Sequence, residues 1–188
     1  ILETVHTGTD FVAAVGIARG VGNPPISPVD ARGIGGPAYS MMVVADLERM
    51  SSFMHEVLGY EIRNRRVQTS SGTAGAMNTP DGTQFELAQM YPPDARHGFV
   101  ILIQFRNLAM AEPPRPPRLP ATGIVMYSFP VAALEPVLER AARAGATGIV
   151  PPRLVDSAAH GRVRHASFVA PNGVRFEVFE AGPRPPGG

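Results

Sequence analysis

The sequence contains no cysteine, no tryptophan and no lysine, and two of these absences remove whole classes of function. Without cysteine the chain has no disulfide, no thiolate nucleophile and no cysteine-ligated zinc. Because all 17 residues counted as lysine or arginine are arginine, Schiff-base chemistry and the lysine of a phosphate-binding loop are excluded as well. The formal net charge is only +1, so we expect neither a nucleic acid nor a membrane as a partner.

Long hydrophobic runs are also absent. The most apolar early stretch, residues 11–22, is about half as long as a membrane-spanning helix and contains Arg19. It also lacks the order of segments that is typical of a signal peptide, so we predict a cytoplasmic protein. The 188 residues are 44% hydrophobic and 18% charged, which is typical of a globular chain with one ordinary domain or two small ones.

Glycine and proline, 20 residues of each, gather near residues 20–37, 112–120 and 182–188. Both residue types weaken regular structure, so these clusters indicate linkers and a chain end. They predict an N-terminal extension or remnant of a preceding module with its linker at 1–37, a first module with an extra strand at 38–111, a proline-rich linker at 112–121, a second module at 122–181 and a disordered tail at 182–188.

The two modules share one order of predicted elements. In the first we expect a strand at 39–44, a helix at 47–58 and strands near 60–68, 73–78 and 83–89, followed by the apolar run 98–105 as an extra strand. In the second we expect a strand at 124–129, a helix that ends near 144 and strands near 147–151, 163–169 and 174–179. The chain is therefore an internal repeat of βαβββ units.

Two stretches carry a resemblance to a known family. Residues 43–61 read VVADLERMSSFMHEVLGYE and resemble the strand–Asp–helix signature of the vicinal oxygen chelate superfamily, which includes glyoxalase I, bleomycin-resistance proteins and extradiol dioxygenases. Residues 167–180 read SFVAPNGVRFEVFE and resemble its closing hairpin, although Ala170 replaces the usual aspartate. The resemblance implies an α+β fold, in which two paired βαβββ modules form a cupped mixed sheet around a central pocket, with the helices on the outer face.

Alternation along the strands predicts which side chains face that pocket. We expect these residues to lie beneath the helices: Phe85, Leu87, Phe176 and Val178. We expect these residues to face the pocket: Gln84, Glu86, Ala88, Arg175, Glu177 and Phe179. Further predicted pocket residues are Met41, Met90, Met126 and Ser128.

Metal-dependent members of the superfamily place a histidine on the first strand and a glutamate on the last strand of their modules. The resemblance places Glu86 and Glu177 at the glutamate positions, but Tyr39 and Met126 at the histidine positions. A thioether is a poor ligand for hard divalent metals, and a neutral phenol is little better. We therefore predict that the protein uses no metal and no other cofactor.

The acid–base candidates are Glu86, Glu177, His165 and Tyr39. Each glutamate has two interpretations: a remnant paired with Arg175 or with the arginines of residues 63–66, or a general base in an apolar cavity. His165 lies where dioxygenase relatives have a catalytic histidine, and imidazole titrates near neutrality. The alternative for His165 is an exposed or locally bonded side chain.

Three functions remain open at this stage. The first is a metal-independent enzyme that binds a small organic molecule and acts on it by acid–base chemistry. The second is a resistance-type protein that sequesters such a ligand without chemistry. The third is the C-terminal half of a four-module, dioxygenase-like enzyme, suggested by the order of elements in residues 1–18. A homodimer is compatible with all three.

Overall fold

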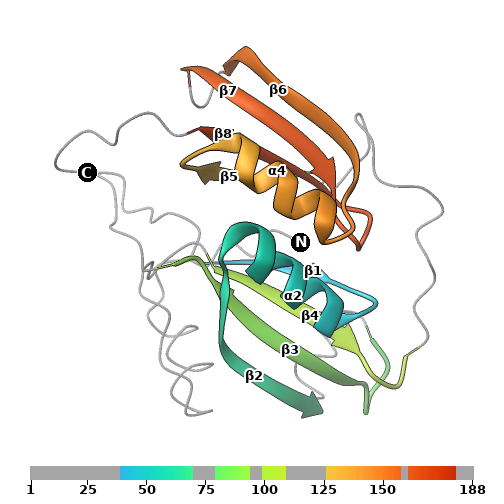
Figure 1. Ribbon diagram of the computed structural model, residues 1–188. Coiled ribbons are helices and arrows are strands. Elements are labelled where there is room, and N and C mark those ends of the chain that lie inside the picture. The colour runs from blue at the N-terminus through green and yellow to red at the C-terminus, as the bar shows by residue number, and fades with distance from the viewer. Residues whose placement is uncertain (1–38, 70–78, 94–98, 109–125, 158–160, 181–188) are drawn as a thin grey trace, which may run out of the picture. The chain divides into compact units, whose positions relative to one another are not determined.

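The computed structural model describes residues 39–69, 79–93, 99–108, 126–157 and 161–180 (Figure 1). Along the chain the elements are β1 (Tyr39–Val43), α2 (Leu47–Leu58), β2 (Glu61–Thr69), β3 (Gln84–Tyr91), β4 (Phe99–Phe105), β5 (Met126–Val131), α4 (Leu134–Arg143), β6 (Thr147–Ser157), β7 (Gly161–Val169) and β8 (Arg175–Glu180). The predicted extension, both linkers, the tail and the strand at 73–78 lie outside these residues. No helix among them is long and apolar enough to cross a membrane.

The strands form two four-stranded sheets with the same topology. Sheet 1 has the order β1-β4-β3-β2 and sheet 2 has the order β5-β8-β7-β6. In each, the first strand runs parallel to the last, and the other neighbours are antiparallel. This confirms the predicted α+β class and the repeat. The chain divides into two compact units: unit 1 comprises residues 1–51 and 59–110, and unit 2 comprises residues 52–58 and 111–188.

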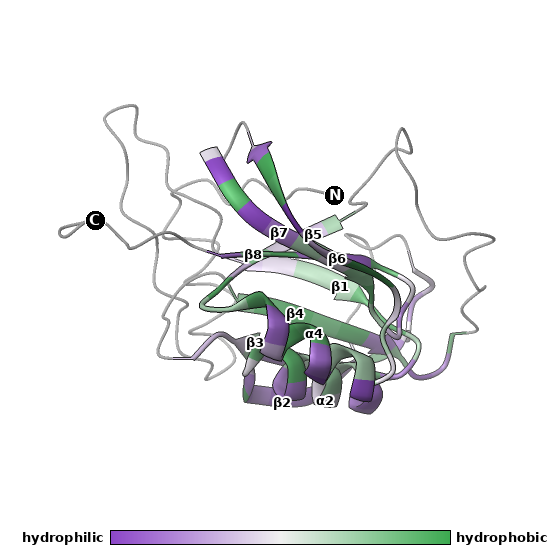
Figure 2. Cartoon of the chain, turned by 45° about the horizontal axis from the view of Figure 1, so that its top comes forward, coloured by the Kyte–Doolittle hydropathy of each residue, from purple (hydrophilic) through white to green (hydrophobic). Residues whose placement is uncertain are grey.

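The closing strand of the first repeat differs from the prediction. The sequence places it at 83–89 and treats 98–105 as an extra strand, whereas in the structure β4 (99–105) closes the repeat by pairing in parallel with β1. β4 lies between β1 and β3 and is coloured as a hydrophobic strand in Figure 2. Its first five residues are buried, so apolar side chains lie on both of its faces. A strand buried on both faces shows no alternation, which is why the sequence did not reveal its place.

In both helices, a side chain from the last strand of the repeat accepts a hydrogen bond from the first backbone N–H, and α2 has a local N-cap as well. Asp46 accepts a hydrogen bond from the backbone N–H of Arg49 at 2.9 Å, which makes it the N-cap of α2. Gln104 Oε1, at the end of β4, accepts from the N–H of Leu47 at 3.1 Å. In the second repeat Glu180 Oε1 accepts in the same way from the N–H of Leu134 at 3.2 Å. The last strand of each repeat thus fixes the start of its helix.

The strands β3 and β4 of sheet 1 are buried on both faces. The helix side, identified by Gln104, carries the buried residues Met42, Ala88, Met90, Val100 and Leu102. The opposite side carries a cluster of Phe85, Leu87, Tyr91, Phe99, Ile101 and Ile103, against which Tyr39, Met41 and Phe105 pack. The rings of Tyr91 and Phe99 are stacked with centroids 4.5 Å apart. We call this second group the apolar cluster of sheet 1.

Unit 2 has its own core on the helix side of sheet 2. Phe53, from the segment of α2 that belongs to this unit, packs edge-on against Phe168 and Phe176, with ring centroids 6.0 and 6.1 Å apart. Arg140 of α4 donates to the backbone carbonyl of Val57 at 3.0 Å. All three rings are almost inaccessible to solvent, so this side of the sheet is filled with hydrophobic side chains.

Candidate functional site

The matching registers of the two sheets show which residues correspond between the repeats. In the second repeat Ser128 lies six residues before the first residue of α4 and pairs with Glu177 across β5 and β8. In the first repeat Met41 lies six residues before the first residue of α2 and pairs with Ile101 across β1 and β4. Ile101 therefore occupies the place of Glu177, and the prediction that Glu86 is its counterpart is wrong.

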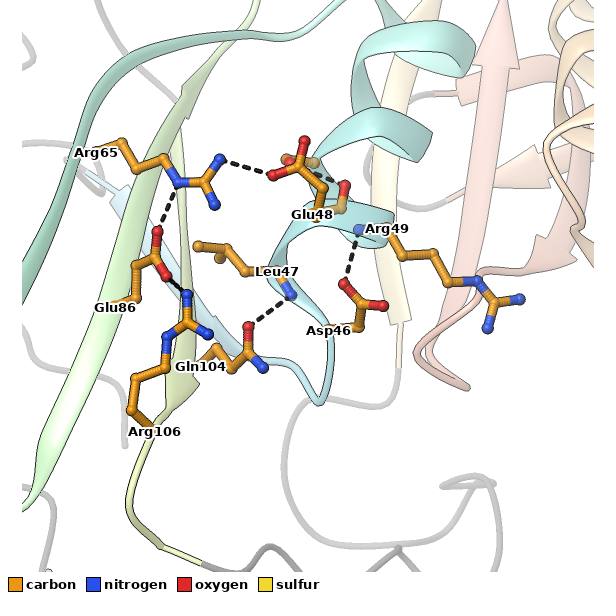
Figure 3. A network of polar contacts seen from close by, with 9 residues as sticks. Asp46, Leu47, Glu48, Arg49, Arg65, Glu86, Gln104 and Arg106 are labelled. Atoms are coloured by element: carbon orange, nitrogen blue, oxygen red, sulfur yellow. Dashed lines mark hydrogen bonds and ion pairs between the residues drawn. The ribbon is translucent and has the colours of Figure 1, made fainter.

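Glu86 points to the helix side of sheet 1 (Figure 3). It pairs in register with Gln104, whose side chain contacts the start of α2. Arg65 Nε donates to one oxygen of Glu86 at 2.6 Å, and Arg106 donates to the other. Arg65 also reaches Glu48 on α2 at 2.7 Å. Glu86 is thus a nearly buried member of an ion-pair network, as in the remnant interpretation.

The whole assignment of faces on β3 is inverted in the same way. Gln84, Ala88 and Met90 are separated from Glu86 by an even number of residues and lie on its side of the sheet. Phe85 and Leu87 belong to the apolar cluster on the other side. The cause is the wrong closing strand. Treating β3 as the last strand of the repeat placed Glu86 on the pocket side, and because side chains alternate along a strand, every other residue of β3 was then assigned to the wrong side as well. Tyr39 and Met41 also lie in the apolar cluster.

In sheet 2 the predicted faces agree with the contacts. Glu180 contacts the start of α4, so the residues that alternate with it on β8, namely Arg175, Glu177 and Phe179, lie on the opposite side. On this side a chain of polar contacts runs across four strands. We call its members the polar face of sheet 2: Ser128 on β5, Glu177 and Arg175 on β8, His165 and Ser167 on β7, and Arg153 on β6.

The contacts of the polar face centre on Glu177. Ser128 Oγ donates to Glu177 Oε2 at 2.6 Å, and His165 Nδ1 lies 3.0 Å from Glu177 Oε1. Arg153 Nε donates to His165 Nε2 at 2.9 Å. At the other end, Arg175 donates to Ser167 Oγ at 3.0 Å. The structure therefore unites four predicted residues with two that sequence analysis missed, Arg153 and Ser167.

The contact with Arg153 determines how the imidazole of His165 is protonated. A guanidinium group only donates, so Nε2 must be an acceptor, and the ring proton then sits on Nδ1. Nδ1 is buried and has no well-aligned hydrogen-bond acceptor among the described residues, although Glu177 is at ion-pair distance. The Nδ1 atom of His165 therefore lies at ion-pair distance from the carboxylate without a hydrogen bond to it.

Burial on the polar face falls from the middle of the sheet to its edges. His165 is 7% and Ser167 8% exposed, whereas the side chain of Glu177 is 23% exposed. Ser128 and Arg153, on the edge strands, are open to solvent. Met126 is partly exposed, and Phe179, next to Glu177 on this side, is nearly buried. A carboxylate with both donors and an apolar neighbour is thus presented at a surface that a small molecule can reach.

The residues at the family's metal positions do not fit a metal ion. The four corresponding places hold Tyr39, Ile101, Met126 and Glu177, which amounts to a single carboxylate ligand. Across the described parts of the chain, no group of three or more His, Cys, Asp or Glu side chains is placed to hold a metal.

Comparisons with known proteins agree with this fold. The model of the Glyoxalase/Bleomycin resistance protein/Dioxygenase superfamily matches residues 36–178. A glyoxalase family protein from Bacillus cereus superposes with a TM-score of 0.64 at 21% identity, covering 77% of this chain and 93% of its own. A glyoxylase/bleomycin resistance protein/dioxygenase domain from Frankia sp. gives 0.53 at 17% identity, with 76% and 94% covered.

A third similar structure is a glyoxalase I mutant from Zea mays, with a TM-score of 0.53 at 15% identity. It covers 78% of this chain, which in turn spans 45% of the maize protein. No curated protein matches. Since the family model covers well over half of the residues and both sheets have the paired βαβββ topology, the chain belongs to the glyoxalase/bleomycin resistance protein/dioxygenase superfamily.

Proposed function

We propose that the protein binds a small organic molecule on the polar face of sheet 2 and transfers a proton with Glu177, without a metal ion. The observation that carries this proposal is the continuous set of contacts from Ser128 through Glu177 and His165 to Arg153. It gives one carboxylate a hydroxyl donor and an imidazole at ion-pair distance, on a solvent-accessible side of a rigid sheet, which is how a general base is held in place.

The chemistry assigned to each group follows from its contacts. Glu177 accepts a proton from the ligand, because it is the only acidic member of the polar face. Ser128 donates to one of its oxygens, and His165 Nδ1 lies at ion-pair distance from the other. The hydrogen bond from Ser128 fixes the orientation of the carboxylate. Arg153 acts through His165 and is a positioning residue here.

Metal independence is supported by the types of residue at the family's ligand positions. Ile101 has no donor atom, Met126 offers only a thioether, and the ring of Tyr39 packs against Phe99 with centroids 5.3 Å apart. Carboxylates suit hard divalent metals such as Mn²⁺, and imidazoles suit Zn²⁺, Fe²⁺ and Ni²⁺. One carboxylate among the four positions leaves a metal without enough ligands.

Sequestration without chemistry is the second candidate function. On the corresponding side of sheet 1, β3 and β4 carry the apolar cluster, and neither strand places an acidic or basic residue on that side. A site that offers its ligand only one carboxylate has few groups for proton transfer, which favours binding without chemistry. The third alternative, half of a four-module enzyme, depends on residues 1–18, which lie outside the described residues.

Elemental analysis and native mass spectrometry of the purified protein test this proposal. We expect less than stoichiometric Fe, Zn, Ni and Mn, together with a bound small molecule whose mass identifies its class. Turnover of that molecule should fall at least a hundredfold in Glu177→Gln. The exposed Glu139 of α4 provides the matched control, and Glu139→Gln should leave turnover unchanged.

The outcomes separate the two candidates. A stoichiometric metal would overturn metal independence. Unchanged turnover in Glu177→Gln would overturn its role as the base. If the wild type binds the molecule without turnover, and Glu177→Gln binds it equally well, the protein is a sequestering one.

A further inference from the structure

Three arginines on the helix sides of the sheets have partners of a different kind from the two arginines of the polar face. On the helix sides, Arg65 and Arg106 share Glu86, and Arg164 contacts Glu135 and Glu180. On the polar face of sheet 2, Arg153 donates to the imidazole of His165 and Arg175 donates to the hydroxyl of Ser167. Neither of these acceptors is a carboxylate.

The positive charges of the polar face are therefore not neutralised. Among the described residues, no ion pair joins Arg153 or Arg175 to a carboxylate. Glu177 is the only acid there, and its oxygens face Ser128 and His165 instead. Two guanidinium groups and one carboxylate leave one excess positive charge, which a single anionic group of a ligand would balance.

The donors that remain suit a carboxylate. Arg153 uses Nε and Arg175 uses one terminal nitrogen in the contacts above, which leaves other N–H groups of each planar fork available. Forked N–H donors recognise carboxylates in a bidentate manner, and such bonds are stronger than neutral ones. The partly buried position of Arg175 weakens competition from water.

The positions of the two arginines place Glu177 between them. Arg175 is the next residue on the same side of β8, about 7 Å along the strand. Arg153 lies two strands away, opposite His165 on β7. An anionic group held by either guanidinium therefore puts the neighbouring atoms of the ligand near the carboxylate of Glu177.

We infer that the ligand is a small organic carboxylate, bound through Arg153 and Arg175 so that its adjacent carbon or hydroxyl faces Glu177. This inference rests on the proposed function, because it uses the same face, and adds the charge and chemical class of the ligand.

Matched pairs of carboxylates and primary amides test the inference, beginning with benzoate and benzamide. Binding to the full ¹⁵N-labelled chain is followed by NMR. We expect benzoate to shift backbone amides near Ser128, His165 and Glu177, and its affinity to fall when NaCl is raised from 0.05 to 0.5 M. Benzamide, of nearly the same shape, should bind at least tenfold more weakly.

Arginine variants connect the effect to the site. We expect Arg153→Gln and Arg175→Gln each to weaken benzoate binding at least tenfold without lowering the thermal unfolding midpoint by more than a few degrees. Arg162→Gln is the matched control, because this exposed arginine of β7 alternates with His165 and points to the other side. Its affinity for benzoate should equal that of the wild type.

Each failure has its own meaning. If the amides bind as well as the carboxylates, or the arginine variants bind normally, the ligand is not held as an anion, although the proposed function stands. If no carboxylate of the panel binds, the inference is also overturned, and the mass-spectrometric measurement decides the proposed function separately. If benzoate shifts only residues away from the polar face, the proposed location of the site fails as well.

Discussion

Glu86 lies between two guanidinium groups and is only 6% exposed, so its role can be tested as one of stability. Glu86→Gln leaves Arg65 and Arg106 without their shared carboxylate. We expect a loss of about 2 kcal/mol in the free energy of unfolding, since both arginines keep partial access to water. Urea denaturation measures the loss, and ligand binding should be unchanged.

The exposed Glu56 of α2 supplies the control for this prediction. Glu56→Gln should alter the unfolding free energy by less than about 0.5 kcal/mol. If Glu86→Gln is equally harmless, the ion-pair network contributes nothing measurable. If it abolishes ligand binding without loss of stability, Glu86 belongs to the site after all.

The buried Tyr60 makes the stability of the protein depend on pH. Burial raises the pKa of the Tyr60 phenol from 10.0 to about 12. The unfolded chain therefore releases this proton at a lower pH than the folded chain. The contribution of Tyr60 to the free energy of unfolding is complete below pH 10 and is lost as the pH rises towards 12. The loss amounts to about 2 to 3 kcal/mol.

Urea denaturation at several pH values between 8 and 11.5 measures this effect. Burial also raises the pKa of Tyr91, so more than one tyrosine contributes to the pH dependence of the unfolding free energy in the wild type. The comparison is therefore between the wild type and Tyr60→Phe. Above pH 10 the free energy of unfolding should fall less steeply in Tyr60→Phe. Parallel curves for the two proteins would contradict the prediction.

At the scale of elements, the start of α4 depends on a residue from another element. Ala133, its N-cap residue, offers no side-chain hydrogen bond, and Glu180 of β8 accepts from Leu134 instead. We expect Glu180→Ala to cost about 1 to 2 kcal/mol in urea denaturation, because the first N–H groups of a helix need acceptors. Gln104→Ala should cost less, since Asp46 also caps α2.

A second substitution checks that capping is the cause. Ala133 has φ −150° and ψ 138°, the extended backbone that N-cap residues adopt. Ala133→Asp should therefore recover part of the stability lost in Glu180→Ala. No recovery would mean that Glu180 acts mainly through its contacts with Arg164.

Both helices and most strands could be predicted because their signals are local. Asp46 caps α2, and Gly59, just past its end, has φ +72°, which favours glycine. The closing strand of the first repeat could not be predicted, because β4 is buried on both sides and pairs with a distant strand. That single error reversed the faces of β3 and moved Glu86 to the wrong side.

Arg153 escaped prediction for a different reason. Its place on the polar face depends on its pairing with His165, and β6 has register irregularities between Thr147 and Val150 and again between Val150 and Arg153. Alternation cannot be counted through such irregularities. The predicted faces of β8 agree with the contacts because that strand is regular and its apolar and polar residues alternate.

At the scale of the whole molecule, the two repeats share a topology and differ in use. Ile101 and Glu177 occupy equivalent places, yet one lies in an apolar cluster and the other on a polar face. We therefore expect the substitutions Ile101→Glu and Glu177→Ile to have opposite effects on stability and on function. Ile101→Glu should cost about 3 kcal/mol or more, because it puts a carboxylate into a buried cluster of aromatic rings. Glu177→Ile should cost less than about 1 kcal/mol but abolish turnover of the ligand.

Urea denaturation of both variants, with Val67→Glu as the control, measures this difference. Val67 is in the same sheet as Ile101 but 60% exposed, so a carboxylate there should change the unfolding free energy by less than about 0.5 kcal/mol. If Ile101→Glu is as stable as Val67→Glu, sheet 1 has a side that accepts charge, and the first repeat is open to ligands as well. A large loss for Ile101→Glu alone means that one repeat supplies the stability of a closed core and the other supplies the binding face.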